Sequence, residues 1–113
     1  MSRASSYPQI IIHLLQQIAQ ESDSTNPKPH LILDHTRNHF MLFTSGWEHI
    51  HRIRIPTLYI RLHQEKIWIE EDFTAGGFAQ KLHCFGVPYH DMVLAFHHPT
   101  IRPYTRFTPH NPA

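Results

Sequence analysis

A strand–helix–strand pattern in residues 66–96 constrains the fold more than any other feature of the chain. Residues 66–72 begin with apolar side chains at every second position, which is the period of a β-strand with one face in a core. Residues 92–96 are all apolar, as is typical of a strand buried on both faces. The segment between them carries apolar side chains at helical spacing. If the two strands lie parallel in one sheet, the connection between them should be right-handed.

The ends of the predicted helix follow from its flanking residues. We expect Thr74 to act as the N-cap, because a threonine hydroxyl can accept a hydrogen bond from the first turn of a helix. Gly86 can adopt the left-handed conformation that ends a helix, and Pro88 blocks continuation. The pattern therefore predicts a helix that begins after residue 74 and ends before residue 86.

An amphipathic helix is expected near the beginning of the chain. Ser6 and Gln9 have the Ser-x-x-Gln spacing of a capping box, and an apolar stripe at helical spacing follows them. Ile10 and Ile12 widen the apolar surface beyond this stripe. They could contact another part of the core or a second subunit.

Three strands should follow the polar segment that ends at Pro29. Residues 30–34 and 39–44 predict a hairpin joined by a tight turn. We expect Gly46-Trp47 to interrupt the second strand before a third strand begins at His51.

The third strand, residues 51–63, changes the parity of its apolar positions at Pro56, which indicates a β-bulge there. The proline-rich sequence after Phe96 predicts an ordered arm over the sheet. The fold class is therefore α+β, with an N-terminal helix, a mostly antiparallel sheet and a strand–helix–strand C-terminal half. A single domain is expected over residues 1–113, with an ordered core over about residues 5–108.

The charge balance argues against a dedicated DNA-binding domain. Ten Lys and Arg side chains stand against nine Asp and Glu, and the pI is about 8.1. A strongly basic footprint is typical of proteins that bind nucleic acid through their surface charge. The twelve histidines add little positive charge near neutral pH.

Cysteine content and hydropathy predict a cytoplasmic protein. Cys84 is the single cysteine, so no internal disulfide can form, and this fits a reducing compartment. No segment approaches the ~20 apolar residues of a membrane span. The first six residues lack the apolar segment of a signal peptide.

No residue pattern identifies an enzyme, a cofactor site or a metal site. Glu70, Glu71 and Asp72 could bind a divalent ion, but a common metal-dependent nuclease also needs an acid-x-lysine triplet, which does not follow them. We interpret this cluster as a solvated turn in which Asp72 helps to start the next helix. The histidines lack the cysteine partners of a zinc site, and the adjacent His97 and His98 would point to opposite faces of a strand.

A basic strand is the remaining candidate for nucleic-acid contact. Arg52, Arg54, Tyr59 and Arg61 combine the cationic and aromatic side chains of a single-strand-binding surface. If the bulge at Pro56 flips the strand, however, we expect this patch to be divided between two faces.

Particular residue runs carry a resemblance to a known family. In the first half they are a Tyr-x-x-Ile-Ile helix opening (residues 7–11), an Asp-x-x-Arg-x-His hairpin (residues 34–39) and Gly46-Trp47. In the second half they are Lys66 to Thr74, Gly77 to Ala79, Leu82, Gly86 to Pro88, Asp91 to Phe96, Pro99, Arg102 and Tyr104-Thr105. On these runs the chain, over about residues 7–108, resembles the XisI family, the cyanobacterial fdxN element excision controlling factors.

The resemblance implies a small α+β accessory protein in the DNA excision that joins a nitrogen-fixation operon during heterocyst development. It implies an XisH-type partner and a site-specific recombinase, through which the protein could contact DNA indirectly. We therefore predict a non-enzymatic partner-binding protein without a cofactor or membrane contact, which could form a homodimer through a sheet edge or the apolar helix. Direct DNA binding and a metal-dependent nuclease subunit are the alternatives.

The predicted partner contacts are exposed aromatic and charged side chains near the central unit: Trp47, Trp68, Glu71, Asp72 and Arg102. Both tryptophans could instead be partly buried in the core, since tryptophan buries readily. Arg102 could pair with an acid such as Asp72 or Asp91.

Overall fold

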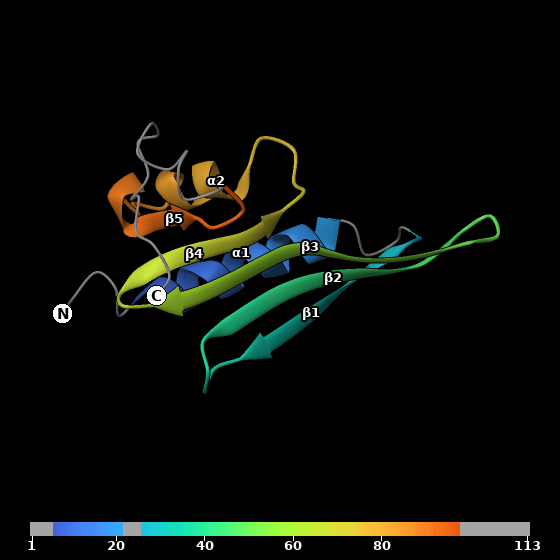
Figure 1. The fold of residues 1–113 in the computed structure, drawn as a ribbon, viewed down its shortest axis with the longest axis horizontal. Helices are drawn as coiled ribbons and strands as arrows, with labels where there is room; N and C mark the ends of the chain where they lie inside the picture. Colours follow the sequence, from blue (N-terminus) through green and yellow to red (C-terminus); the bar gives the residue numbers. More distant parts are fainter. Residues whose placement is uncertain (1–5, 22–25, 98–113) are drawn as a thin grey trace.

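A computed structural model of the chain describes residues 6–21 and 26–97. It contains α1 (Tyr7–Glu21), β1 (Lys28–Asp34), β2 (His39–Glu48), β3 (His51–His63), β4 (Lys66–Asp72), α2 (Phe78–Cys84), a 3₁₀ turn η2 (Tyr89–Asp91) and β5 (Met92–Leu94). The strands form one sheet in the order β1-β2-β3-β4-β5 (Figure 1). All neighbouring strands are antiparallel except β4 and β5, which are parallel. The predicted α+β fold is confirmed.

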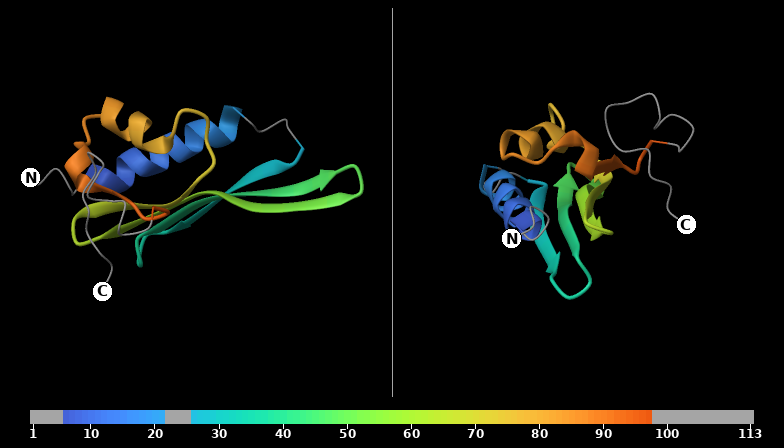
Figure 2. Two further views of the ribbon diagram at one scale, coloured as in Figure 1. Left: turned by 45° about the horizontal axis from the view of Figure 1, so that its top comes forward. Right: turned by 90° about the vertical axis from the view of Figure 1, so that its left-hand side faces the viewer.

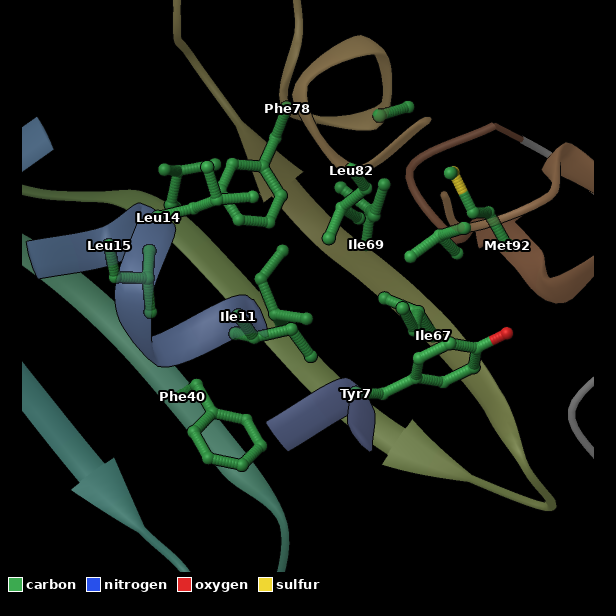
Figure 3. Close-up of a cluster of buried hydrophobic side chains, with 14 of the residues drawn as sticks. Tyr7, Ile11, Leu14, Leu15, Phe40, Ile67, Ile69, Phe78, Leu82 and Met92 are labelled. Atoms are coloured by element: carbon green, nitrogen blue, oxygen red, sulfur yellow. The ribbon is translucent and has the colours of Figure 1, made fainter. Parts of the chain in front are cut away.

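Both helices cover the same face of the sheet, as Figure 2 shows. The core lies between the helices and this face (Figure 3), and its fully buried side chains include Tyr7, Ile11, Leu15, Phe40, Leu42, Leu58, Ile60, Ile67, Ile69, Phe78, Leu82 and Met92. Ile10 and Ile12 are partly buried and pack against this core. The α-helices of the described residues are α1 and α2, and neither is long and apolar enough to cross a membrane.

The strand–helix–strand unit is confirmed, although its second strand is shorter than predicted. β5 ends at Leu94 because the chain turns there and the His97 N–H donates back to the Leu94 carbonyl, while the Ala95 N–H still donates to the Ile69 carbonyl of β4. The helix between the strands ends where expected, with Gly86 at a φ of 93°. The arm expected after Phe96 lies outside the described residues, apart from its first residue.

The predicted N-cap of α2 is wrong. The capping position is Gly77, three residues after Thr74. Asp72 satisfies the helix start from further upstream, because its Oδ2 accepts a hydrogen bond from the Phe78 N–H at 2.6 Å. The acid that ends β4 therefore also begins α2.

The predicted interruption of β2 at Gly46-Trp47 is also wrong. β2 continues to Glu48, with Gly46 paired to Ile53 and Trp47 to Arg52 of β3. The glycine marks a close approach of the backbone, since a Cβ there would lie 2.5 Å from Asn26 Oδ1 and 2.8 Å from Pro27 Cα. Because β2 does not stop, β2 and β3 form a long hairpin that extends past the helices (Figures 1 and 2).

The β-bulge at Pro56 is confirmed. Leu42 pairs with Leu58, whereas the next residue of β2, Phe43, pairs with Pro56, so Thr57 is the extra residue. Apolar side chains on both sides of the bulge therefore keep to the same face of the sheet.

Candidate functional site

The end of the β2–β3 hairpin is an arm that no other strand of the described residues supports. β1 pairs with β2 only as far as Ser45, and β4 pairs with β3 only from Leu58 onward. Residues 46–53, which we call the hairpin arm, therefore form a two-stranded ribbon that projects beyond the helical layer (Figure 2). A two-stranded ribbon buries little apolar surface by itself.

Large apolar side chains are exposed on the hairpin arm. Ile50, at its tip, is 86% exposed, and Trp47 is 54% exposed. The guanidinium carbon of Arg52 lies 5.5 Å from the centre of the Trp47 ring, and Arg52 Nη1 donates to the Gly46 carbonyl at 3.3 Å. Tryptophan and arginine are the side chains that most often dominate protein–protein binding energy. The arm thus presents an interaction surface.

The basic face is continuous across the bulge, so the prediction that the bulge divides it is wrong. Arg52 and Arg54 lie opposite Trp47 and Ser45, while Tyr59 and Arg61 lie opposite Met41 and His39. These four β2 residues all occupy odd positions of one strand, and directly paired residues share a face. The two arginines of β3 before the bulge therefore lie on the same face as Tyr59 and Arg61.

Glu70 neutralises the positive charge at the Arg61 end of this face. Arg61 Nε lies 2.7 Å from Glu70 Oε2, and both side chains are about three-quarters buried. Burial raises the pKa of the Tyr59 hydroxyl, and the Glu70 carboxylate raises it further. Cationic character is therefore concentrated at Arg52 and Arg54, toward the end of the hairpin.

Trp68 is fully buried, so the expectation that it is exposed is wrong. Its ring lies against the Arg61 guanidinium, whose carbon is 4.6 Å from the ring centre, and its Nε1 donates to the His63 carbonyl at 3.3 Å. Strand alternation places Trp68 on the face opposite the helical core, and the side chain is buried there. A partner could reach it only after a rearrangement.

Asp72 has a structural role at the end of β4. Its Oδ1 accepts hydrogen bonds from the backbone N–H and the hydroxyl of Thr74, and its Oδ2 accepts one from the Phe78 N–H. Glu71 is half-buried and pairs with Tyr59 across the strands. No three His, Cys, Asp or Glu side chains of the described residues are grouped so that they could hold a metal ion.

A small pocket opens at the carboxyl ends of the two parallel strands. It has a volume of about 200 Å³ and is lined by Asp72, Gly76, Gly77, Ala79, Gln80, Tyr89, Leu94 and Phe96. This volume is below the ~300 Å³ at which ligand sites for drug-sized molecules begin. The pocket can accept a side chain or a similarly small group.

The structure does not bring the predicted contact residues together. Trp47 pairs with Arg52, whereas Asp72 pairs with Leu58. Because these β3 residues are six positions apart, about 20 Å separates them along the strand. Trp68 is buried, and Arg102 lies outside the described residues. The sequence interpretation missed Ile50, which follows Trp47 closely and is visible as an isolated apolar residue among polar ones.

Comparisons with known proteins match this chain over nearly its whole length. A crystal structure of an XisI-like protein from Anabaena variabilis is 30% identical, with a TM-score of 0.86 over 94% of this chain and 98% of that one. The fdxN element excision controlling factor XisI from the same organism is 29% identical, with a TM-score of 0.83 over 96% and 100%. A comparison with curated proteins gives no match.

The family comparison agrees with the structural one. A family model described as "XisI protein" matches residues 1–109. The chain therefore belongs to the XisI family, which is named for the fdxN element excision controlling factor.

Proposed function

We propose that this protein is a non-enzymatic controlling factor for site-specific DNA excision, and that it acts by binding a protein partner through the hairpin arm. The observation that carries the proposal is the exposed Trp47–Arg52 pair with Ile50 beside it on a ribbon that projects from the core. The similar Anabaena protein described as an excision controlling factor supports the process.

The chemistry of the arm supports a protein partner. A surface in which Trp47 and Ile50 are both exposed costs free energy in water, and burial in a partner's apolar pocket would recover it. Arg52 and Arg54 would then face the rim of the interface, where acidic side chains complement them. An XisH-type protein and the recombinase are the candidates that the family implies.

Direct DNA binding is a second candidate, because Arg52, Arg54 and Trp47 share one face. The net charge of +1 and the pairing of Arg61 with Glu70 argue against it. A metal-dependent nuclease subunit is not proposed, since the Asp72 carboxylate already binds the backbone of its own chain.

The test is co-expression with an XisH-type protein, followed by size-exclusion chromatography at physiological salt. We expect one stoichiometric complex. Trp47→Ala should weaken it about thirtyfold, equivalent to about 2 kcal/mol, if Trp47 is a binding hot spot. Phe85→Ala is the matched control, because Phe85 is 49% exposed and lies just after α2, away from the arm.

Each outcome separates the candidates. Co-elution that both variants leave unchanged would contradict the role of the arm. Separate elution, together with binding of the isolated protein to duplex DNA that weakens steeply with salt and on Arg54→Ala, would favour direct DNA binding.

A further inference from the structure

The outer edge of β1 is an open strand edge among the described residues. β1 is the first strand in the sheet order and pairs with β2 on one side only. Figure 1 shows this edge running along the side of the sheet away from β5. Within Lys28–Asp34, every second residue therefore presents backbone N–H and C=O groups that another strand could pair with, while the residues between direct theirs toward β2.

Pro29 indicates which backbone groups face this edge. A proline has no N–H to donate, so within a sheet its nitrogen faces away from the neighbouring strand. Residues alternate in the direction of their backbone groups, and Leu31 and Leu33 therefore face outward with Pro29. The open edge offers two donors, from Leu31 and Leu33, and three carbonyl acceptors.

The sequence of β1 is complementary to itself in the antiparallel direction. With Leu31 opposite Leu31 of a second copy, Lys28 lies opposite Asp34, and His30 lies opposite Ile32. If the two-fold axis lies at residue 30 or 32 instead, Lys28 and Asp34 no longer lie opposite each other. We propose that β1 is the interface of a homodimer, in which two copies pair in this register to form one continuous ten-stranded sheet.

The proposed register satisfies the outward-facing backbone groups. Leu31 of each copy donates to Leu31 of the other, and Leu33 donates to Pro29, which makes four hydrogen bonds. Because Pro29 has no N–H, each copy lacks one hydrogen bond, the one to the Leu33 carbonyl of the second copy. Ile32, which is 50% exposed, becomes covered by His30 and by Ile32 of the second copy.

Asp34 is held in position for the second copy's lysine. Its Oδ1 accepts hydrogen bonds from the backbone N–H groups of Thr36 at 3.1 Å and Arg37 at 3.0 Å. Its Oδ2 lies 3.8 Å from Nη1 of Arg37, a long contact to a side chain that is 78% exposed. A fixed carboxylate loses little conformational entropy when it pairs with Lys28 of the second copy.

The part of β3 that β4 does not pair with differs from β1 in a way that favours this choice. On the hairpin, β3 carries Arg52, Arg54 and Pro56 before β4 begins to pair with it. Repeated like charge and proline are devices that prevent a strand from pairing with its own copy. In β1, by contrast, the two charges have opposite signs and lie at opposite ends, so a second copy attracts them.

A register-specific cross-link tests the proposal. With Cys84→Ser as background, Leu31→Cys places two thiols across the axis, with Cα atoms about 5.5 Å apart, a span that a disulfide bridges. Leu33→Cys is the matched control, because Leu33 lies opposite Pro29. After mild oxidation, we expect a non-reducing denaturing gel to show a reducible dimer band for the first variant and a monomer band for the second. Equal cross-linking, or cross-linking of the second variant alone, would overturn the register.

The mass of the unmodified chain provides an independent readout. Light scattering should give twice the chain mass of 13.3 kDa. Lys28→Glu should raise the dimer dissociation constant about tenfold, since it places like charges opposite each other twice. Lys81→Glu, the same charge change on α2, should leave it unchanged. A single-chain mass at every concentration, or equal effects of the two lysine variants, would refute the dimer.

Discussion

Replacing Asp72 should destabilise the fold far more than replacing the acid beside it. The Asp72 carboxylate accepts backbone hydrogen bonds from Thr74 at 3.0 Å and from Phe78 at 2.6 Å, and a third bond from the Thr74 hydroxyl. These bonds close the loop between β4 and α2 and begin the helix, for which Gly77 supplies no side-chain cap. Asp72→Ala removes all three bonds together.

The expected cost is about 3 kcal/mol. A hydrogen bond to a charged group is worth about 1.5–3 kcal/mol, and loss of a helix cap costs about 1 kcal/mol. The expected loss of stability is smaller than that of three independent hydrogen bonds. Asp72 is half-buried, so water can replace part of the lost bonding. Asp72→Asn keeps one carbonyl acceptor and should cost about half as much. For a domain of this size, 3 kcal/mol lowers the melting temperature by roughly 13 °C.

The measurement is urea unfolding followed by circular dichroism, with Glu71→Ala as the control at the adjacent half-buried acid. Glu71→Ala should change the free energy of unfolding by less than about 0.5 kcal/mol. Equal effects of the two variants would refute the capping role of Asp72. If Asp72→Ala instead kept the full stability of the fold and lost partner binding, the partner contact that the sequence predicts for Asp72 would be favoured.

Three further predictions concern residues that the structure explains. Trp68→Ala should cost about 3–5 kcal/mol in urea unfolding, because the ring is fully buried, whereas Trp47→Ala should cost less than about 1 kcal/mol. Gly46→Ala should cost about 1–3 kcal/mol in the same assay, because its Cβ would lie 2.8 Å from the Pro27 backbone. Tyr59 should ionise above its ordinary pKa of 10, as absorbance at alkaline pH would report against Tyr59→Phe. Because the folded-state pKa is the raised one, the stability from neutral Tyr59 is complete below pH 10 and is lost as the pH rises further.

Local sequence patterns predicted the elements but not all of their ends. The periods of β4, α2 and β5 are properties of short segments, so the strand–helix–strand unit could be identified from residues 66–96. The sequence predicts that Asp72 helps to start α2, but not that the capping position is Gly77, because the contact spans the six residues from Asp72 to Phe78. The end of β5 is set by the turn in which the His97 N–H donates to the Leu94 carbonyl, and the apolar run of residues 92–96 does not indicate this turn.

The basic face could have been predicted correctly from the same sequence. Before the bulge the apolar positions are Ile53 and Ile55, and after it they are Leu58 and Ile60. A bulge that shifts the apolar positions from odd to even shifts the polar positions from even to odd, so both faces stay continuous. The close approach at Gly46 is different, since nothing near it in the sequence indicates the contact with Asn26 and Pro27.

The hairpin arm and the β1 edge have a joint consequence, because the arm begins where β1 begins. Lys28 pairs with Ser45, and β2 enters the arm at the next residue. In a two-fold pairing of β1, the two Lys28 ends point in opposite directions, so the two arms would project from opposite ends of the sheet. Each partner molecule would then bind one arm, and the dimer would hold two partner molecules apart.

This arrangement predicts different behaviour for the two kinds of variant. Trp47→Ala should weaken partner binding and leave a dimer. Lys28→Glu should leave each arm intact and, at concentrations between the dimer dissociation constants of the unmodified chain and the variant, convert a two-to-two complex into a one-to-one complex. On a surface with immobilised partner, the Lys28→Glu variant should dissociate faster, because the dimer gains avidity from its second arm. If both variants gave the same loss in solution, where avidity is absent, the arm and the edge would belong to one interface rather than two.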